Sequence, residues 1–411
     1  MNTKSKSSIN GIVLVASGAI GAGMFSLPIV SAGMWFGWTI VCLILVWLAN
    51  LYAALVLLET NLKFHPGASF DTLVGETLGS TWNALNNLSI AFVMYILLYA
   101  YFSASGSIVA QTYPLLFAEP ISISQNLSSV VFGTVIALLV SSGASMVSRI
   151  CSVLLIGMVI SFFLTTSGLL LHIEVKNLIV AQIPSTALPT YIWAALPFFV
   201  TSFACSGIIP SLVKFYGHDE TKIKHSLIYG TLISLFIYIV WVLTVFGTIN
   251  RDEIAPVISA GGNIGDLVNA LQIRTESSNM SLMVNLFSNF AIASSFLSIG
   301  LGLFDYIADK FNFGNTVIGR SKSAALTFLP PAILSYLFPH GFIIAIGYAG
   351  LVVLFSFYIV PIMMAFKNRL QTRPSFSKLL EQPLLICLLI FSLFIAVIKI
   401  LTVQNIVPVY P

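Results

Sequence analysis

Long apolar segments, separated by short stretches that hold nearly all of the charge, are the feature of this sequence that most limits its fold. The hydrocarbon core of a bilayer is about 30 Å thick, and a helix needs roughly 20 apolar residues to cross it. Backbone groups in lipid must be hydrogen-bonded within the segment itself, so each spanning segment is expected to be a helix. Hydropathy predicts eleven of them: Ile9–Ala32, Phe36–Asn61, Trp82–Phe117, Leu127–Gly143, Ile150–Leu171, Tyr191–Val213, Ile223–Phe246, Ser281–Asp309, Ser323–Phe338, Phe342–Phe366 and Pro383–Leu401. The predicted fold class is an all-α polytopic membrane protein.

Composition supports a single transmembrane domain over residues 1–411 with no appended soluble domain. Of these residues 58% are hydrophobic and 8% are charged, whereas soluble domains carry about 25% charged residues. The longest loop on the side opposite the amino terminus is Gly247–Met280. Within it, Asp266–Ile273 is amphipathic, and it is interpreted as either a short surface helix over the outer end or a plain connector.

The distribution of basic residues predicts the orientation, because Lys and Arg accumulate in cytoplasmic loops. With the amino terminus in the cytoplasm, four basic residues fall on the far side: Lys176, Arg251, Arg274 and Lys399. The other fourteen fall on the cytoplasmic side: Lys4, Lys6, Lys63, Arg149, Lys214, Lys222, Lys224, Lys310, Arg320, Lys322, Lys367, Arg369, Arg373 and Lys378. The carboxyl terminus is therefore expected on the outer side.

Two of the predicted spans are interrupted. The first contains Gly18, Gly21 and Gly23, and each Gly costs a helix about 1 kcal/mol relative to Ala. The sixth is interrupted between Pro197 and Pro210, since proline removes a backbone donor and disfavours helix before it. Breaks five spans apart are typical of a five-plus-five inverted repeat. The corresponding ranges are about 9–171 for the first repeat, 189–366 for the second, and 383–401 for an extra helix.

The breaks suggest how an amino acid could be held. A half-helix that begins near Gly21–Gly23 directs free N–H groups and a positive dipole end toward an anion such as a carboxylate. Half-helices that end near Ala19 and Thr201–Ala204 expose carbonyls, which suit an ammonium group. A zwitterion could thus be bound without charged side chains. The alternative is that these glycines serve only close helix packing.

Several segments resemble those of the hydroxy/aromatic amino acid permease family (tryptophan/tyrosine permeases), and the similarity is close to its tryptophan-specific members. Ile20–Pro28, with the sequence IGAGMFSLP, resembles the opening signature of that family. The other segments are Ala68–Thr72, Ser89–Tyr101, Ser288–Phe296, Leu301–Tyr306, Ala345–Gly350 and Val407–Tyr410. The resemblance implies a transporter of the LeuT-like fold, in the APC superfamily, with eleven spans. It also implies proton-coupled uptake of an aromatic amino acid, tryptophan or tyrosine, across a bacterial inner membrane.

The resemblance also implies a binding site, carried over residue by residue. Backbone N–H groups of Ala22 and Gly23 would bind the substrate carboxylate. Carbonyls of Ala19, Thr201 and Ala204 would bind the ammonium group. The implied mechanism is ion-coupled symport by alternating access around this central site.

The sequence departs from the family pattern in two spans, the sixth and the fifth. Phe203 is expected to close over the substrate ring, but Cys205 and Ser206 stand where the family pattern has larger, polar side chains. Met158 occupies a position in the fifth span where members often carry Lys. The sequence therefore leaves open which amino acid is carried, and whether a proton or sodium is the coupling ion.

Aromatic side chains in the third span form a candidate wall of the site. Tyr95, Tyr99 and Phe102 share one helical face, which Ser103 and Gly106 continue. If this face meets the broken spans, the rings would line the pocket for a flat substrate. The alternative is aromatic packing between helices.

A few polar groups remain for ion coupling or gating. Asp305 could be a proton-linked gate or a helix-end acid, and Glu59 could be a gate or a solvated helix end beside Lys63. Ser294 and Ser295 could supply hydroxyls to a cation site, or bond to their own or a neighbouring helix.

Other function classes find less support. The five His residues lie in or near loops, so an enzyme with a His-based site at mid-membrane is not expected. Cysteine spacing fits no metal site. The expected partners are an amino acid and membrane lipid, with no nucleic acid and no cofactor besides the coupling ion. A sensor that binds an amino acid without moving it is the alternative class, and the oligomeric state is left open.

Overall fold

The computed structural model describes residues 8–117, 124–179, 188–275, 278–314, 316–371, 382–404, 406–407 and 410. Within these ranges all regular secondary structure is helical. Nine helical segments in the described part are long and apolar enough to cross a bilayer, or ten if the bent pair near the amino terminus counts as one span. The prediction of an all-α polytopic membrane protein is confirmed. Lys4, Lys6, Arg373 and Lys378, on which part of the orientation prediction rests, lie outside the described residues.

The observed helices follow the predicted spans closely. The two largest boundary shifts are equal. Helix α7 begins at Ala144 rather than Ile150, directly after Gly143 with a φ of +120°, and the helix of the ninth predicted span begins at Val317 rather than Ser323. The unbroken spanning helices are α3 (Trp35–Asn61), α5 (Ser80–Phe117), α6 (Gln125–Ser142), α7 (Ala144–Leu170), α11 (Glu220–Thr248), α14 (Ser278–Lys310) and α18 (Gln382–Val403). The segment 342–371 consists of α16 (Phe342–Leu354), the π-helix η3 (Phe355–Ile359) and α17 (Val360–Gln371).

The ninth predicted span requires a correction. A helix, α15 (Val317–Leu337), covers the expected Ser323–Phe338, but it does not belong to the segments that are apolar enough to span a bilayer. Its first turns carry Arg320 and Lys322, and charged groups lower the mean hydropathy of the segment. The predicted count of eleven spans is therefore not confirmed.

The connections contain short helices of their own. The loop after α11 folds into α12 (Arg251–Ser259) and α13 (Ile264–Thr275). The amphipathic segment Asp266–Ile273 is thus helical, and the plain-connector alternative is wrong. Two further short helices are α4 (Phe70–Leu78) and α8 (Val175–Leu178).

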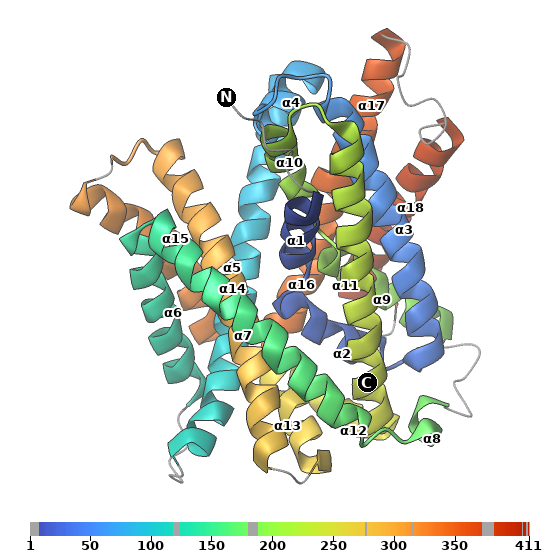
Figure 1. The fold of residues 1–411 in the computed structure, drawn as a ribbon, viewed down its shortest axis with the longest axis vertical. Coiled ribbons are helices and arrows are strands. Elements are labelled where there is room, and N and C mark those ends of the chain that lie inside the picture. Colours follow the sequence, from blue (N-terminus) through green and yellow to red (C-terminus); the bar gives the residue numbers. More distant parts are fainter. Residues whose placement is uncertain are drawn as a thin grey trace.

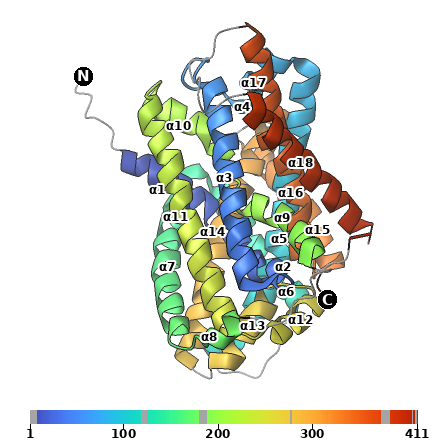
Figure 2. The same ribbon diagram turned by 90° about the vertical axis from the view of Figure 1, so that its right-hand side faces the viewer.

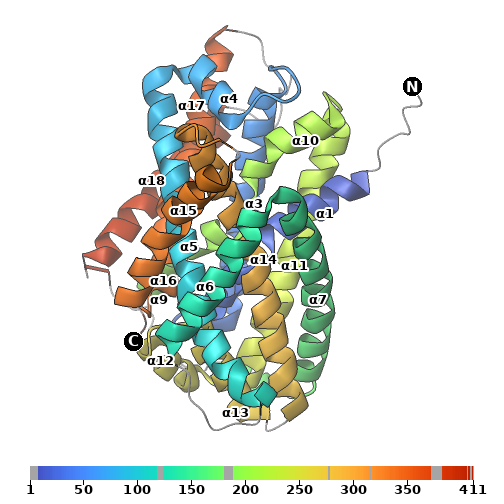
Figure 3. The same ribbon diagram turned by 90° about the vertical axis from the view of Figure 1, so that its left-hand side faces the viewer.

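The short helices gather at opposite ends of the bundle (Figure 1). Helix α4 lies at one end, and the first described residues lie in the half of the bundle nearest to it, whereas α8, α12 and α13 lie at the other end. Helix α18 lies on one flank of the bundle, and α6 and α15 lie on the opposite flank (Figures 2 and 3).

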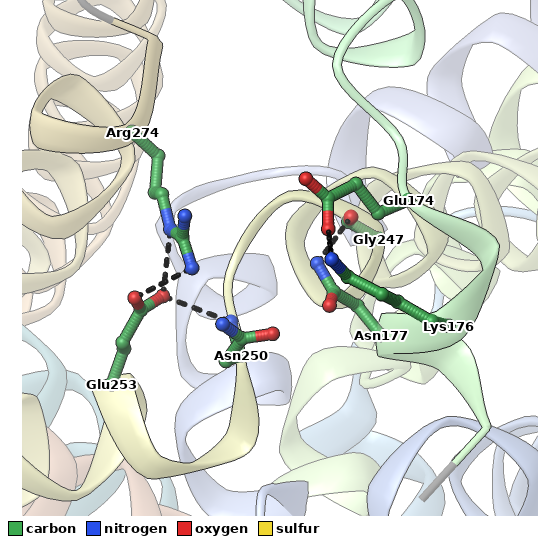
Figure 4. Close-up of polar contacts among 7 residues, drawn as sticks. All are labelled: Glu174, Lys176, Asn177, Gly247, Asn250, Glu253 and Arg274. Atoms are coloured by element: carbon green, nitrogen blue, oxygen red, sulfur yellow. Dashed lines mark hydrogen bonds and ion pairs between the residues drawn. The ribbon is translucent and has the colours of Figure 1, made fainter.

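Polar contacts fix the connections at the α12–α13 end (Figure 4). Arg274 forms a bidentate pair with Glu253, with nitrogen–oxygen distances of 2.8 and 3.0 Å. The same carboxylate accepts the backbone N–H of Asn250 at 3.0 Å, so α12 and α13 are joined at the start of α12. Nearby, Asn177 of α8 donates to the carbonyl of Gly247 at 3.1 Å. These contacts tie α12 to α13 and α8 to α11.

Candidate functional site

The first span is broken where the glycines predict it. Helix α1 (Ser8–Ala19) ends before Ile20, a 3₁₀ turn η1 covers Ala22–Phe25, and α2 (Ser26–Ser31) follows at an angle of 49° to α1. Gly21 is extended, with φ −170° and ψ −161°, a conformation open to any residue. Glycine is needed there for space, because a Cβ would lie 2.6 Å from the Ser295 hydroxyl oxygen.

The sixth span is broken as well. Helix α9 (Leu188–Ser202) ends before three non-helical residues, Phe203–Cys205. A 3₁₀ turn η2 (Ser206–Ile208) leads into α10 (Ile209–Tyr216), whose first turn contains Pro210. Proline suits a first turn, since its missing N–H has no helical partner there. Both predicted interruptions are present.

The two breaks lie against each other and share one hydrogen-bonding group. The hydroxyl of Tyr238, on α11, lies 2.7 Å from the carbonyl oxygen of Ala19 and 2.6 Å from that of Ser202. A hydroxyl has a single proton, so the two carbonyls share it. The Ser202 hydroxyl in turn lies 3.4 Å from the carbonyl oxygen of Gly23. The last residues of α1 and α9 are thereby held together.

A cavity of about 540 Å³ lies beside the two breaks. Pockets that hold small molecules have volumes of about 300–1,000 Å³, so this cavity can accept an amino acid. Its wall comes from the two breaks, α5, α7, α14, α16 and η3. Nine of the predicted site residues lie on that wall: Ala19, Gly21, Ala22, Gly23, Thr201, Ala204, Cys205, Ser294 and Ser295.

Beyond the break in the first span, an aromatic cluster fills the interior. Phe25, Trp241 and Phe287 are fully buried, with ring centroids 5.1 to 5.5 Å apart. Ser148 and Ser152, in the first turns of α7, are exposed residues of the cavity wall. Part of the cavity wall is therefore exposed near the start of α7.

The predicted aromatic wall on α5 is wrong. Tyr95 donates its hydroxyl to the carbonyl of Leu326 at 2.9 Å, and Tyr99 donates to that of Phe338, also at 2.9 Å. Both side chains face α15 and its end, so the alternative, packing between helices, is right. Successive residues of an α-helix are about 100° apart, and the cavity meets a different face. The α5 residues on the wall are Ile90, Val93, Met94, Leu97 and Tyr101.

Phe203 and Ser206 lie behind the cavity wall. Phe203 is fully buried, and its ring centroid is 5.0 Å from that of Tyr238. Ser206 is fully buried as well. Neither is a wall residue, so the expectation that both contribute side chains to the pocket is not met.

The two serines of α14 have different partners. Ser294 donates to the carbonyl of Ala291 at 3.1 Å, within its own helix. The hydroxyl of Ser295 accepts the backbone N–H of Ala22 at 3.2 Å. Ser295 therefore joins α14 to the break of the first span, at an amide predicted to bind a carboxylate.

The two acids considered for gating lie away from the cavity wall. Glu59 is 5% exposed and lies 3.9 Å from the Lys63 amine, near the end of α3. The helix-end alternative for Glu59 is right about the ion pair, but the carboxyl is buried rather than solvated. Asp305 is exposed on α14, outside the wall.

The structure adds a polar network that the sequence did not indicate. Tyr358, in the π-helix η3, donates to the side-chain oxygen of Asn50 at 3.3 Å. The Asn50 amide nitrogen lies 4.0 Å from the Cys205 sulfur at the break of the sixth span. A π-helix pairs residues five apart, so its turn is one residue wider than that of an α-helix. Neither hydropathy nor periodicity predicts where such a turn occurs.

The site offers backbone groups, hydroxyls and a thiol rather than charged ligands. In the part of the chain that the structure describes, no group of three or more His, Cys, Asp or Glu side chains lies close enough to hold a metal ion. Met158 is buried in α7. The chemistry of this wall is binding by hydrogen bonds and apolar contact.

Comparison with known proteins agrees with the segments quoted above. Residues 4–401 match the model of the tryptophan/tyrosine permease family. The chain is 42% identical to a tryptophan-specific transport protein of Shigella flexneri, over 99% of this chain and 98% of the relative. It is also 42% identical to one of Pseudomonas aeruginosa (strain UCBPP-PA14), over 98% and 96%. It is 41% identical to a tyrosine permease of Enterobacter agglomerans, over 84% and 83%. The chain therefore belongs to the tryptophan/tyrosine permease family.

Proposed function

We propose that this protein is a secondary active transporter that imports an aromatic amino acid, tryptophan or tyrosine, across the bacterial inner membrane. The observation that carries the proposal is the cavity beside the two broken helices. Its wall combines backbone N–H and carbonyl groups of the breaks with apolar side chains. The names of the relatives support the substrate class, since they are tryptophan-specific transport proteins and a tyrosine permease. An alternative substrate is another neutral amino acid.

The substrate would bind as a zwitterion at the breaks. Its carboxylate would meet the N–H groups of Gly21, Ala22 and Gly23, where it competes with the Ser295 hydroxyl for the Ala22 amide. Its ammonium group would lie near the carbonyls of Ala19 and of residues 201–204. The ring would then lie among the apolar wall residues of α5.

Transport would proceed by alternating access in a five-plus-five inverted repeat, with residues 9–171 and 189–366 as the repeats and 383–401 as the extra helix. Discontinuous helices at a central site are typical of such transporters. Most of the basic residues belong to the end where the described chain starts, which supports a cytoplasmic amino terminus and a periplasmic carboxyl terminus. In that orientation the cavity, whose wall is exposed where α7 begins, faces the cytoplasm.

The coupling ion is proposed to be a proton. Sodium is a second candidate because Met158 replaces the basic residue often found in the fifth span, and because Ser294 and Ser295 bring hydroxyl oxygens to the cavity wall. Oxygen ligands suit hard cations. Asp305 and Glu59, both outside the wall, would act at a distance from the substrate if they take part.

The test is uptake by purified protein in liposomes. Radiolabelled tryptophan, tyrosine and phenylalanine are offered in turn under an imposed proton gradient and under an imposed sodium gradient. Accumulation of an aromatic amino acid driven by the proton gradient supports the whole proposal. Accumulation driven only by sodium changes the ion, and equilibration without accumulation under either gradient rejects secondary active transport. Binding without any uptake favours the alternative class, a sensor.

A further inference from the structure

The cavity wall contains one serine whose surroundings differ from those of its neighbours. Ser356 lies on the wall, in the π-helix η3, and its side chain is fully buried. In the described ranges, several buried side-chain nitrogen and oxygen atoms have no hydrogen-bond partner. Of these atoms, the Ser356 hydroxyl oxygen is the one that belongs to the cavity wall. A buried hydroxyl without a partner is unfavourable, so it calls for an explanation.

Other hydroxyls on the same wall are satisfied locally. Each donates to a carbonyl three or four residues earlier in its own helix, the common arrangement for Ser and Thr inside helices. These residues are Ser17, Ser152, Thr201, Ser202, Ser294 and Ser298. Ser356 differs from these six in lying in the π-helix η3 and in having a buried hydroxyl without a partner.

The local structure around Ser356 is a π-helix. Over Phe355–Ile359 the backbone pairs five residues apart instead of four, which widens the turn and re-aims the side chains. The Ser356 hydroxyl has no hydrogen-bond partner among the described residues. Single turns of π-helix occur frequently at functional sites.

The surroundings of Ser356 indicate which part of a ligand it would meet. The carboxylate and ammonium groups have their proposed partners at the breaks around Gly21–Gly23 and Thr201–Ala204. Ser356 lies on another element, next to Val353 and Phe357 of the wall. Tyr358, two residues further along the chain, donates to Asn50 and not to Ser356. The substrate side chain is therefore the part available to it.

We propose that Ser356 is a specificity-determining residue whose hydroxyl accepts a hydrogen bond from a ring-borne N–H or O–H of the substrate. The inference rests on the proposed function. Serine has one χ angle with three staggered positions, so its hydroxyl can turn toward a ligand once the wall residues that cover this buried side chain move aside. An indole N–H or a phenol O–H supplies the donor, and phenylalanine supplies none. The residue thus favours tryptophan and tyrosine over phenylalanine.

The test compares substrate pairs that differ in this donor. Liposomes containing the full-length protein take up radiolabelled tryptophan in competition with four unlabelled amino acids. One pair is tryptophan and tryptophan methylated on its indole nitrogen, and the other is tyrosine and phenylalanine. In the unaltered protein the donor-bearing member of each pair should compete about three- to tenfold better, the range expected for one hydrogen bond.

The Ser356→Ala variant should remove this difference by weakening the two donor-bearing competitors alone. Ser392→Ala is the matched control, because Ser392 is equally buried but donates to the carbonyl of Leu388 in α18, outside the cavity wall. It should leave all four affinities unchanged. If Ser356→Ala does not fold, Ser356→Cys keeps the size with a weaker acceptor and should narrow the difference.

Three results overturn the inference. In the first, the two members of each pair compete equally well for the unaltered protein. In the second, the difference in competition persists in the Ser356→Ala variant. In the third, all four amino acids lose affinity equally in the variant, which would mean that Ser356 has a packing role. Failure of the proposed function looks different, since the unaltered protein would then take up no aromatic amino acid. In that case the inference falls with it.

Discussion

The hydroxyl of Tyr238 offers a sharp test of how the two broken helices are held. Tyr238→Phe removes the only proton shared by the carbonyls of Ala19 and Ser202, which lie 2.7 and 2.6 Å away. The variant keeps the ring and its packing on Phe203, at a centroid distance of 5.0 Å. The substitution therefore isolates the hydrogen bond from the apolar contacts of a fully buried side chain.

The expected loss follows from that geometry. One proton serves both carbonyls, so the change counts as one buried hydrogen bond, and leaving buried acceptors unmatched costs about 1–3 kcal/mol. A loss of 1 kcal/mol shifts the melting temperature by about 2–4 °C for 150–250 residues and by less for longer chains. We therefore expect a decrease of roughly 1–4 °C.

The assay is thermal unfolding of the purified protein in detergent, followed by gel filtration of the fraction that stays monodisperse. Tyr229→Phe is the control, because Tyr229 lies on the same helix with half of its side chain exposed, and it should not change the melting temperature. If Tyr238→Phe melts at the same temperature as the control, the hydroxyl does not hold the breaks together. A decrease of the same size in both variants would also refute the reasoning.

The remaining predictions concern the break and the outer connections. Gly21→Ala should lower thermal stability by about 1–3 kcal/mol through overpacking against Ser295, and adding Ser295→Ala should restore much of it in the same melting assay. Arg274→Ala removes a partly exposed ion pair with Glu253, worth about 0.2–1 kcal/mol, so its small destabilisation should shrink further in high salt. Burial raises the pKa of the Asp266 carboxyl, so the folded state holds that proton more tightly than the unfolded state. The stability contribution of Asp266 should therefore fall as the pH rises above 3.8, the pKa of this carboxyl in the unfolded chain. Asp266→Asn should flatten this part of a plot of unfolding free energy against pH. An unchanged plot would contradict the prediction.

The sequence was sufficient to predict the spans and both breaks, because these depend on local properties. Apolar length determines where a helix can cross lipid, and the glycines around Gly21 together with Pro197 and Pro210 disfavour continuous helix wherever they occur. The ninth span shows the limit of that reasoning. Its helix formed as expected, but Arg320 and Lys322 leave its place in the bilayer undecided.

Side-chain direction could not be predicted in the same way. The face with Tyr95 and Tyr99 was as reasonable a cavity wall as the face with Tyr101, since only packing against other helices decides between them. The same holds for Phe203, which fills the interior beside Tyr238 instead of the cavity. Ser356, whose hydroxyl has no partner, lies in a π-helix, and no residue pattern in 355–359 predicts a π-helix.

The measurement that tests the central claim most directly is equilibrium binding of radiolabelled tryptophan to the purified protein and to its Gly23→Leu variant. Gly23 lies on the cavity wall, and its Cβ position has only ordinary contacts of 3.7 and 3.9 Å, with Ser202, so the longer side chain should enter the cavity while the fold is kept. The account predicts saturable binding that tyrosine competes for, and loss of that binding in the variant at an unchanged melting temperature. Binding of equal strength in both proteins, or no binding of any aromatic amino acid by the unaltered protein, would contradict it.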